Sequence, residues 1–112
     1  MRPIPLKLLI HEAVLNNIVT DDYQNEQDQL ATALYRVRFE PETRLVKNAG
    51  GVDVQCTALM FFDMINSWPV GATFDVGKQS IVWDGRRYHI EDVQRLYDEN
   101  KLHHLEVYLS DG

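Results

Sequence analysis

The dipeptide Asp84-Gly85 lies between two short runs of strand-like composition, SIVW and RRYHI. Asp-Gly is favoured in two-residue hairpin turns because both central residues of such turns take a positive φ. In the second run Tyr88 and Ile90 would face one side of the strand. The polar residues Arg87, His89 and Glu91 would face the other. The stretch therefore predicts an antiparallel β-hairpin with one buried face.

ALYRVRFEP, at residues 33–41, is the clearest single strand pattern in the chain. Its alternation predicts one face for the core, carrying Tyr35, Val37 and Phe39, and one face for water or a partner. The residues predicted on that second face are Leu34, Arg36, Arg38 and Glu40. Pro41 is expected to end the strand, because proline has no N–H to donate.

Two further segments fit either a strand or a helix. Residues 6–14 alternate weakly and fit a strand or one and a half helical turns, although two early prolines favour an extended entry. Residues 52–65 fit a buried strand through about Phe62, while 58–65 also fits a short helix. Strands are also expected at residues 73–77, 80–83 and 101–109, with a turn over 66–73.

This density of short strands indicates the fold class. Six or seven strands with turn residues every 8 to 12 positions are typical of an all-β sandwich or a small barrel. At 112 residues the chain has the size of one domain. We expect a single domain over residues 1–112 that is mostly β: a small antiparallel β-barrel or sandwich with at most one short helix.

Two polar segments are expected to be loops. Residues 20–30, TDDYQNEQDQL, carry four carboxylates but lack the alternating ligands and the glycine of an EF-hand. A solvated hairpin loop is the better interpretation. Residues 42–51, ETRLVKNAGG, end in a Gly-Gly pair that disfavours regular structure. A loop this long in a small domain is typically functional or disordered.

The adjacent histidines His103 and His104 are the strongest candidates for chemistry. Neighbouring strand residues point to opposite faces, so His103 is expected at the end of the apolar face and His104 is expected to point outward. A zinc site needs three or four converging ligands, and no third is evident at a suitable spacing. A weak surface cation site from His89 and His104 stays open as an alternative. Its carboxylate would come from Glu106 or Asp98.

Other residue types give no sign of catalysis. Cys56 is the single cysteine, and its apolar neighbours favour a small buried residue over a reactive thiol. No serine lies in a GxSxG motif, and no glycine pattern would cradle a phosphate. We predict no catalytic residue, no metal and no cofactor.

The net charge of −6 restricts the classes of partner. A protein that grips nucleic acid needs a basic face, and Arg86-Arg87 is the single basic cluster here. No apolar run approaches the roughly 18 residues that a membrane helix needs, and the N-terminus does not fit a secretory signal. We therefore expect a cytosolic protein with no membrane partner.

The order of four segments is more informative than any one residue. These segments are RPIPLKLLIHEAVL, ALMFFDMINSWP, SIVWDGRRYHIEDVQRLYD and NKLHHLEVYL. Together they resemble the minor capsid or head–tail connector proteins of tailed bacteriophages and their prophages, over nearly the whole chain. The most specific part is the C-terminal end, where the hairpin, a bend at residues 93–99 and KLHH lead into the last strand.

The resemblance implies a structural role without catalysis or cofactor. It implies a small β-barrel subunit that forms a ring with other copies of itself below the portal, completes the head and joins the tail. The implied partners are the portal or an adaptor, tail proteins, and double-stranded DNA that passes without sequence-specific binding. The implied location is the head–tail junction of the virion, with assembly in the host cytoplasm.

Loop length and charge suggest which segments make contacts. We hypothesise that the 41–52 loop faces the channel or a neighbouring subunit, and that segments 1–5 and 20–30 contact adjacent rings. An acidic lumen would not grip passing DNA. The candidate interaction residues are Arg44, Leu45, Val46, Lys47, Asn48, Gly50, Gly51, Asp21, Asp22, Tyr23 and His104.

A second hypothesis is a small β-barrel binding module that recognises single-stranded nucleic acid or a peptide. Aromatic and arginine side chains on one barrel face could stack bases. The residues concerned are Tyr35, Trp83, Tyr88, Arg86 and Arg87. The negative net charge weighs against this hypothesis.

Overall fold

The computed structural model describes residues 5–20, 22–23, 25–47, 50–70 and 72–111. Within these residues there are one short 3-10 helix and six strands. They are η1 (Leu6–Leu8), β1 (His11–Thr20), β2 (Glu26–Lys47), β3 (Asp53–Asp63), β4 (Gln79–Trp83), β5 (Arg86–Asp98) and β6 (Lys101–Asp111). The prediction of a mostly β fold with antiparallel strands and at most one short helix is confirmed.

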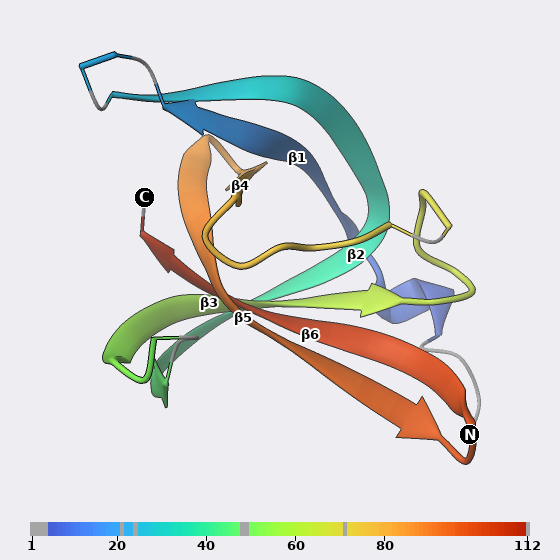
Figure 1. Cartoon of the computed structure of the whole chain (residues 1–112). Helices are drawn as coiled ribbons and strands as arrows, with labels where there is room; N and C mark the ends of the chain where they lie inside the picture. The colour runs from blue at the N-terminus through green and yellow to red at the C-terminus, as the bar shows by residue number, and fades with distance from the viewer. Residues whose placement is uncertain (1–4, 21, 24, 48–49, 71, 112) are drawn as a thin grey trace.

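The six strands close into a barrel in the order β1-β2-β3-β6-β5-β4 (Figure 1). The first three strands form one antiparallel meander and the last three form a second. The two meanders join at two seams, β3 with β6 and β1 with β4. Of the two architectures left open by the sequence, the structure is therefore the barrel.

Strand β2 is long, at 22 residues, because it pairs with two different strands in succession. Its first half, up to Val37, pairs with β1, and its second half, from Arg38, pairs with β3. Figure 1 shows the strand curving around the barrel as it changes partner. A β-bulge lies at the change: the register shifts there, and Arg36 has a φ of 57°. A bulge adds one residue to its strand and bends it.

This bulge overturns the alternation predicted for residues 34–40. Leu34 and Val37 lie three positions apart, yet both are fully buried, while Tyr35 between them is exposed. The prediction that placed Tyr35 on the core face and Leu34 on the opposite face was wrong. A strict period of two fails wherever an extra residue is inserted, because every later side chain changes face.

Strand β2 also continues past Pro41, where the sequence predicted its end. The register shifts between Pro41 and Arg44, and pairing then runs from Arg44 opposite Cys56 to Lys47 opposite Asp53. Proline is tolerated at such irregular positions because no ladder hydrogen bond needs its missing N–H. The expected loop over 42–51 is therefore strand as far as Lys47.

Other element boundaries also differ from the predictions. Residues 6–8 form η1, so the first strand begins only at His11. Residues 26–30 belong to β2, and the bend expected at 93–99 is strand as far as Asp98. Residues 73–77, expected as a strand, are irregular, and 58–63 are strand, not helix. Strand formation depends on a neighbour that supplies hydrogen-bond partners, which local composition does not reveal.

The Asp84-Gly85 hairpin is confirmed. Both residues have positive φ, 51° and 76°, and Trp83 lies opposite Arg86 across the turn. This geometry matches the hairpin twist, so it fixes the register of β4 against β5. Tyr88 and Ile90 are buried, as the alternation predicted.

The barrel interior holds the main hydrophobic core. Its buried residues are Ala13, Leu15, Leu34, Val37, Phe39, Ala58, Met60, Phe62, Phe74, Ile81, Tyr88, Ile90, Leu105, Val107 and Leu109. A second, small cluster contains Cys56, Leu59 and Tyr108, with Val46 and Phe61 packed against it. Burial raises the pKa of the Cys56 thiol, and the prediction of a buried apolar cysteine is confirmed.

Beyond the bulge, a side chain accepts a hydrogen bond from one backbone N–H on the edge of β2 that faces away from β3. The Phe39 N–H donates a hydrogen bond to Nδ1 of His11, over 3.0 Å. This acceptor must be unprotonated, and burial followed by the charge of Arg38 lowers the pKa of His11. The first residue of β1 thus extends the β1–β2 pairing past its last backbone partner.

The bulge predicts an unusual response to glycine. Arg36→Gly should raise the free energy of unfolding by up to about 1 kcal/mol, because glycine relieves the cost of a left-handed backbone. The control Thr32→Gly, at an exposed site of the same strand, should lower it by about 0.5–1 kcal/mol. Urea denaturation measures both, and equal destabilisation by the two substitutions would contradict the bulge at Arg36.

Candidate functional site

The predicted interaction residues fall on two sides of the barrel. Figure 1 shows the β1–β2 and β2–β3 hairpins on one side, and the β3–β4 connection and the β5–β6 hairpin on the other. Strand β3 runs from Asp53 near the first side to Asp63 near the second. Its 11 residues span about 33 Å. The molecule measures 47 × 28 × 25 Å, so these two sides are its distant ends.

The β2–β3 hairpin holds most of the predicted residues, but they have different surroundings. Leu45 is 70% exposed, and Val52, which lies in the predicted 41–52 segment but was not a named candidate, is 61% exposed. Lys47 is exposed opposite Asp53. Gly50 and Gly51 are exposed as well, and Gly51 has a φ of 78°. The tip of the β2–β3 hairpin therefore presents the apolar side chains of Leu45 and Val52 to solvent. We call this tip the hairpin end.

Arg44 and Val46 on the same hairpin instead pack within the chain. Arg44 Nη1 donates a hydrogen bond to the Tyr108 hydroxyl over 3.0 Å, and its guanidinium carbon lies 5.5 Å from the ring centroid. Arg44 Nη2 also lies 2.9 Å from a Glu42 carboxylate oxygen. Val46 packs on the small cluster around Tyr108. These two residues position the hairpin and are poor candidates for binding a partner.

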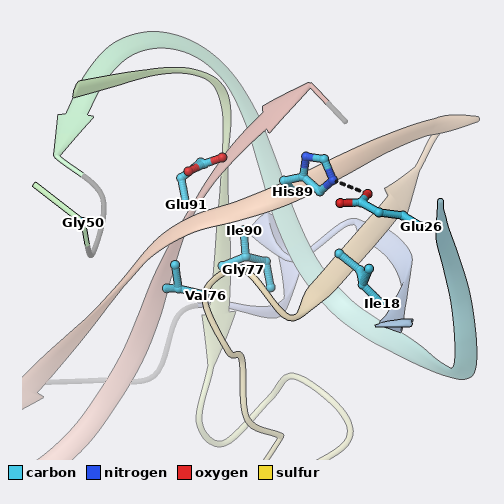
Figure 2. A pocket seen from close by; sticks show the side chains of 8 residues that line it. All are labelled: Ile18, Glu26, Gly50, Val76, Gly77, His89, Ile90 and Glu91. Atoms are coloured by element: carbon cyan, nitrogen blue, oxygen red, sulfur yellow. Dashed lines mark hydrogen bonds and ion pairs between the residues drawn. The ribbon is translucent and has the colours of Figure 1, made fainter. Parts of the chain in front are cut away.

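The β1–β2 hairpin and the tip of the β2–β3 hairpin border one hollow from different sides (Figure 2). Ile18, Glu26 and Gly50 line one hollow of about 400 Å³ together with residues of β5 (Figure 2). Asp22 and Tyr23 lie in the turn, and Tyr23 is among the most exposed apolar residues. The structure thus brings these predicted segments to the same end. Asp21, Asn48 and residues 1–4 of the predicted 1–5 segment lie outside the described residues.

An ionic cluster ties the β1–β2 hairpin to β5. Arg87 Nε donates to Asp28 over 2.9 Å, and Arg87 Nη2 lies 3.1 Å from Glu26. His89 Nε2 contacts the same Glu26 carboxylate at 3.0 Å, the dashed line in Figure 2. Hydrogen bonds from His89 and Arg87 lower the pKa of Glu26, and the hydrogen bond from Arg87 lowers the pKa of Asp28. The cluster braces a hairpin that extends beyond the end of β4.

This cluster predicts a pH dependence of stability. Carboxylates with a lowered pKa in the folded state stabilise it above their unfolded pKa of about 4, and that contribution is lost as pH falls. As the pH is lowered from about 5 to about 2, the free energy of unfolding should therefore fall less steeply in Arg87→Gln than in the wild type. Arg95→Gln, at an exposed position of β5, is the matched control. Urea denaturation across this range would refute the role of Arg87 if all three proteins gave one slope.

His104 lies on the same side of β6 as Tyr108, away from the core residues Leu105 and Val107, so the predicted face is confirmed but the side chain is largely covered. Its side chain is only 16% exposed. It lies at the opposite end of the barrel from the β1–β2 and β2–β3 hairpins, with Asp63 beside it on β3. Its Nδ1 lies 2.7 Å from Nδ1 of His103, and its Nε2 lies 3.7 Å from Glu106. Burial and then the neighbouring His103 lower the pKa of His104. The imidazole ring of His104 packs against the rings of Phe61 and His103.

The proposed cation site between His89 and His104 is not formed. His89 lies opposite Ser80 and Ser110, whereas His104 lies opposite Asp63 and Leu96. Among the described residues, no three His, Cys, Asp or Glu side chains lie in a group that could hold a metal ion. In the same part of the chain, no helix is long and apolar enough to cross a membrane.

The residues suggested for a nucleic-acid face do not form one. Tyr88 is buried in the core, and Trp83 stacks on Phe39 with ring centroids 4.5 Å apart. Arg87 belongs to the ionic cluster. Tyr35 lies elsewhere, against Trp68. Stacking on successive bases needs exposed rings along one groove, and this arrangement does not supply them.

One exposed apolar surface was not predicted from the sequence. Tyr35, Ile65, Trp68 and Val70 surround a hollow of about 520 Å³ at the end opposite the hairpins. Ile65, Trp68 and Val70 are 68%, 52% and 71% exposed. Contiguous exposed apolar side chains mark protein interaction sites. We call these four residues the aromatic platform.

Buried polar groups hold the aromatic platform in place. Asp63 Oδ2 accepts hydrogen bonds from the backbone N–H groups of Ile65 and Asn66, over 3.0 and 2.7 Å. Ser67 Oγ accepts from the Asp63 N–H over 2.9 Å and donates to the Arg36 carbonyl. Tyr35 and Trp68 also exchange two backbone hydrogen bonds, of 2.9 and 3.0 Å. The loop is therefore fixed against the bulge of β2.

The NSWP composition signalled a turn at this place but not its exposed apolar surface. The signal that could have revealed it is the spacing of Ile65, Trp68 and Val70 within a turn, where apolar side chains have no regular face to bury. Tyr35 could not be assigned without knowledge of the bulge.

Ser67 is predicted to stabilise this loop. Ser67→Ala should lower the free energy of unfolding by about 1–3 kcal/mol, because it leaves the Asp63 N–H and the Arg36 carbonyl without their partner. Thr73→Ala, at an exposed position before β4, should change it by less than about 0.5 kcal/mol. Denaturant unfolding with amide exchange over residues 64–70 checks both. Equal stability of the two variants would contradict the bracing role.

The features described above are exposed surfaces at the two ends of the barrel. Comparison with curated proteins finds no match. Residues 5–109 match the family described as minor capsid protein. That match covers most of the 112-residue chain and agrees with the resemblance in the order of its segments. The chain therefore belongs to the phage minor capsid protein family.

Proposed function

We propose that this minor capsid protein is a head–tail connector subunit, which assembles with other copies into a ring below the portal. Family membership gives the chain a structural role in the phage virion. In the proposed ring the protein completes the head, contacts the portal or an adaptor, and joins the tail.

The observation that carries the proposal is the exposure of apolar side chains at both ends of an elongated barrel. Leu45 and Val52 are exposed at the hairpin end, and the aromatic platform is exposed at the other. A subunit that lies between other proteins needs contact surfaces on more than one side. Exposed apolar residues are unfavourable in water and are covered on assembly.

The net charge of −6 also supports a conduit for DNA. A lumen that lets double-stranded DNA pass must not bind its phosphates tightly. Acidic proteins lack the counterion-release attraction that basic proteins have for DNA. We propose that DNA passes through the ring without sequence-specific contact, whether the ring acts as a conduit or a stopper.

The hairpin end provides the test. Leu45→Glu and Val52→Glu should leave the barrel folded, since both side chains are exposed, but should lower incorporation into particles by about tenfold or more. A charge at an interface core costs at least about 1.4 kcal/mol, which corresponds to tenfold in binding.

The matched control is Thr43→Glu, which adds the same charge to an exposed site of the same hairpin without removing an apolar side chain. Quantitative detection of the protein in purified particles, with electron microscopy of tailless heads, gives the readout. Wild-type incorporation of the Leu45 and Val52 variants would rule out the hairpin as a contact site. Absence of the wild-type protein from particles would overturn the connector proposal itself.

A further inference from the structure

The hairpin end and the aromatic platform are two different surfaces on one subunit. Both expose apolar side chains, and β3 separates them by about 33 Å. A two-fold dimer buries the same surface of both subunits, whereas a ring or filament joins one surface to a different one. Two dissimilar apolar surfaces at opposite ends are what the second kind of contact requires.

The shapes of the two surfaces are complementary. The hairpin end projects from the barrel (Figure 1), where Leu45 lies on β2 and Val52 lies just before β3. The aromatic platform instead surrounds an open hollow of about 520 Å³. The buried Asp63 carboxylate accepts a hydrogen bond from the Asn66 N–H, and Ser67 Oγ accepts one from the Asp63 N–H, so the loop that borders the hollow is fixed within the chain. A preformed site loses little conformational entropy on binding.

Charged residues beside the two surfaces are complementary as well. At the hairpin end, Lys47 lies directly opposite Asp53 across the β2–β3 pairing. Glu12 and Arg36 line the hollow of the platform. All four side chains are exposed. If the hairpin of one copy lay on the platform of another, these charges would allow Lys47 to face Glu12 and Asp53 to face Arg36.

We infer that the β2–β3 hairpin of one copy inserts Leu45 and Val52 into the aromatic platform of the next copy. This inference rests on the proposed connector function and specifies its subunit contact. The contact joins unlike surfaces, so repetition of it generates a closed ring when the rotation between copies closes. Trp68 and Tyr35 are the aromatic anchors of the contact, a residue type that carries much of the binding energy at interfaces.

A pair of introduced cysteines tests the contact. Leu45→Cys and Ile65→Cys, placed together in one chain, should give a ladder of disulfide-linked dimers, trimers and larger species when purified particles are oxidised. Each single variant should remain monomeric on a non-reducing gel. The native Cys56 is buried and its thiol pKa is raised, so it does not contribute.

Reversal of one charge pair tests the register. Lys47→Glu or Glu12→Lys, each added to the two-cysteine chain, should reduce the ladder about fivefold, as loss of a surface ion pair of about 1 kcal/mol would. The two reversals combined should restore it. Restoration requires that Lys47 of one copy face Glu12 of another, which a folding defect in either variant would not produce.

Three outcomes would overturn the inference while leaving the connector function standing. The first is incorporation of the two-cysteine chain into particles without a ladder. The second is strong dimer formation by Leu45→Cys alone, which would mean hairpin-to-hairpin contact. The third is a ladder that the combined reversal fails to restore. Failure of the proposed function is recognised separately, because the protein would then be missing from particles altogether.

Discussion

Strand β2 pairs first with β1 and then with β3, and the rest of the barrel depends on this change of partner. A straight strand of 22 residues could not lie on the wall of so small a barrel. The bulge at Arg36 and the irregularity between Pro41 and Arg44 bend it. With β2 bent, β1 can reach β4 and β3 can reach β6, so the two meanders close on each other.

The same bulge links the fold to the surface at one end. It turns Leu34 and Val37 inward and Tyr35 outward, and it presents the Arg36 carbonyl to Ser67. Asp63 and Ser67 then fix the loop that carries Ile65, Trp68 and Val70. Most buried polar side chains in folded proteins are hydrogen-bonded. Here those hydrogen bonds position apolar residues in solvent, which suits a surface that another protein covers.

At the other end, some residues brace the hairpins and others are exposed to solvent. Arg44 covers Tyr108, and Arg87 ties Glu26 and Asp28 to β5. Leu45, Val52 and Tyr23 stay exposed. A virion protein that joins neighbours on several sides needs rigid projections with apolar tips, because rigid surfaces lose less entropy when they dock. The barrel thus supplies a stable body, and its two ends carry the surfaces that we propose for contacts with other virion proteins.

Local sequence determined the features that depend on neighbouring residues. The Asp84-Gly85 turn, the inward faces of Tyr88 and Ile90, and the mostly β composition follow from turn chemistry and from a period of two. The order of the segments also led to the family.

The tertiary structure alone decided the features that depend on strands distant in sequence. Residues 26–30 and 42–47 became strand because β1 and β3 offered them partners, whereas 73–77 did not. The bulge at Arg36 shifted Tyr35 to the surface, and the loop after Asp63 then placed Trp68 beside it. The aromatic platform arises from the pairing of Tyr35 with Trp68, because residues 30 or more positions apart meet only when the barrel closes.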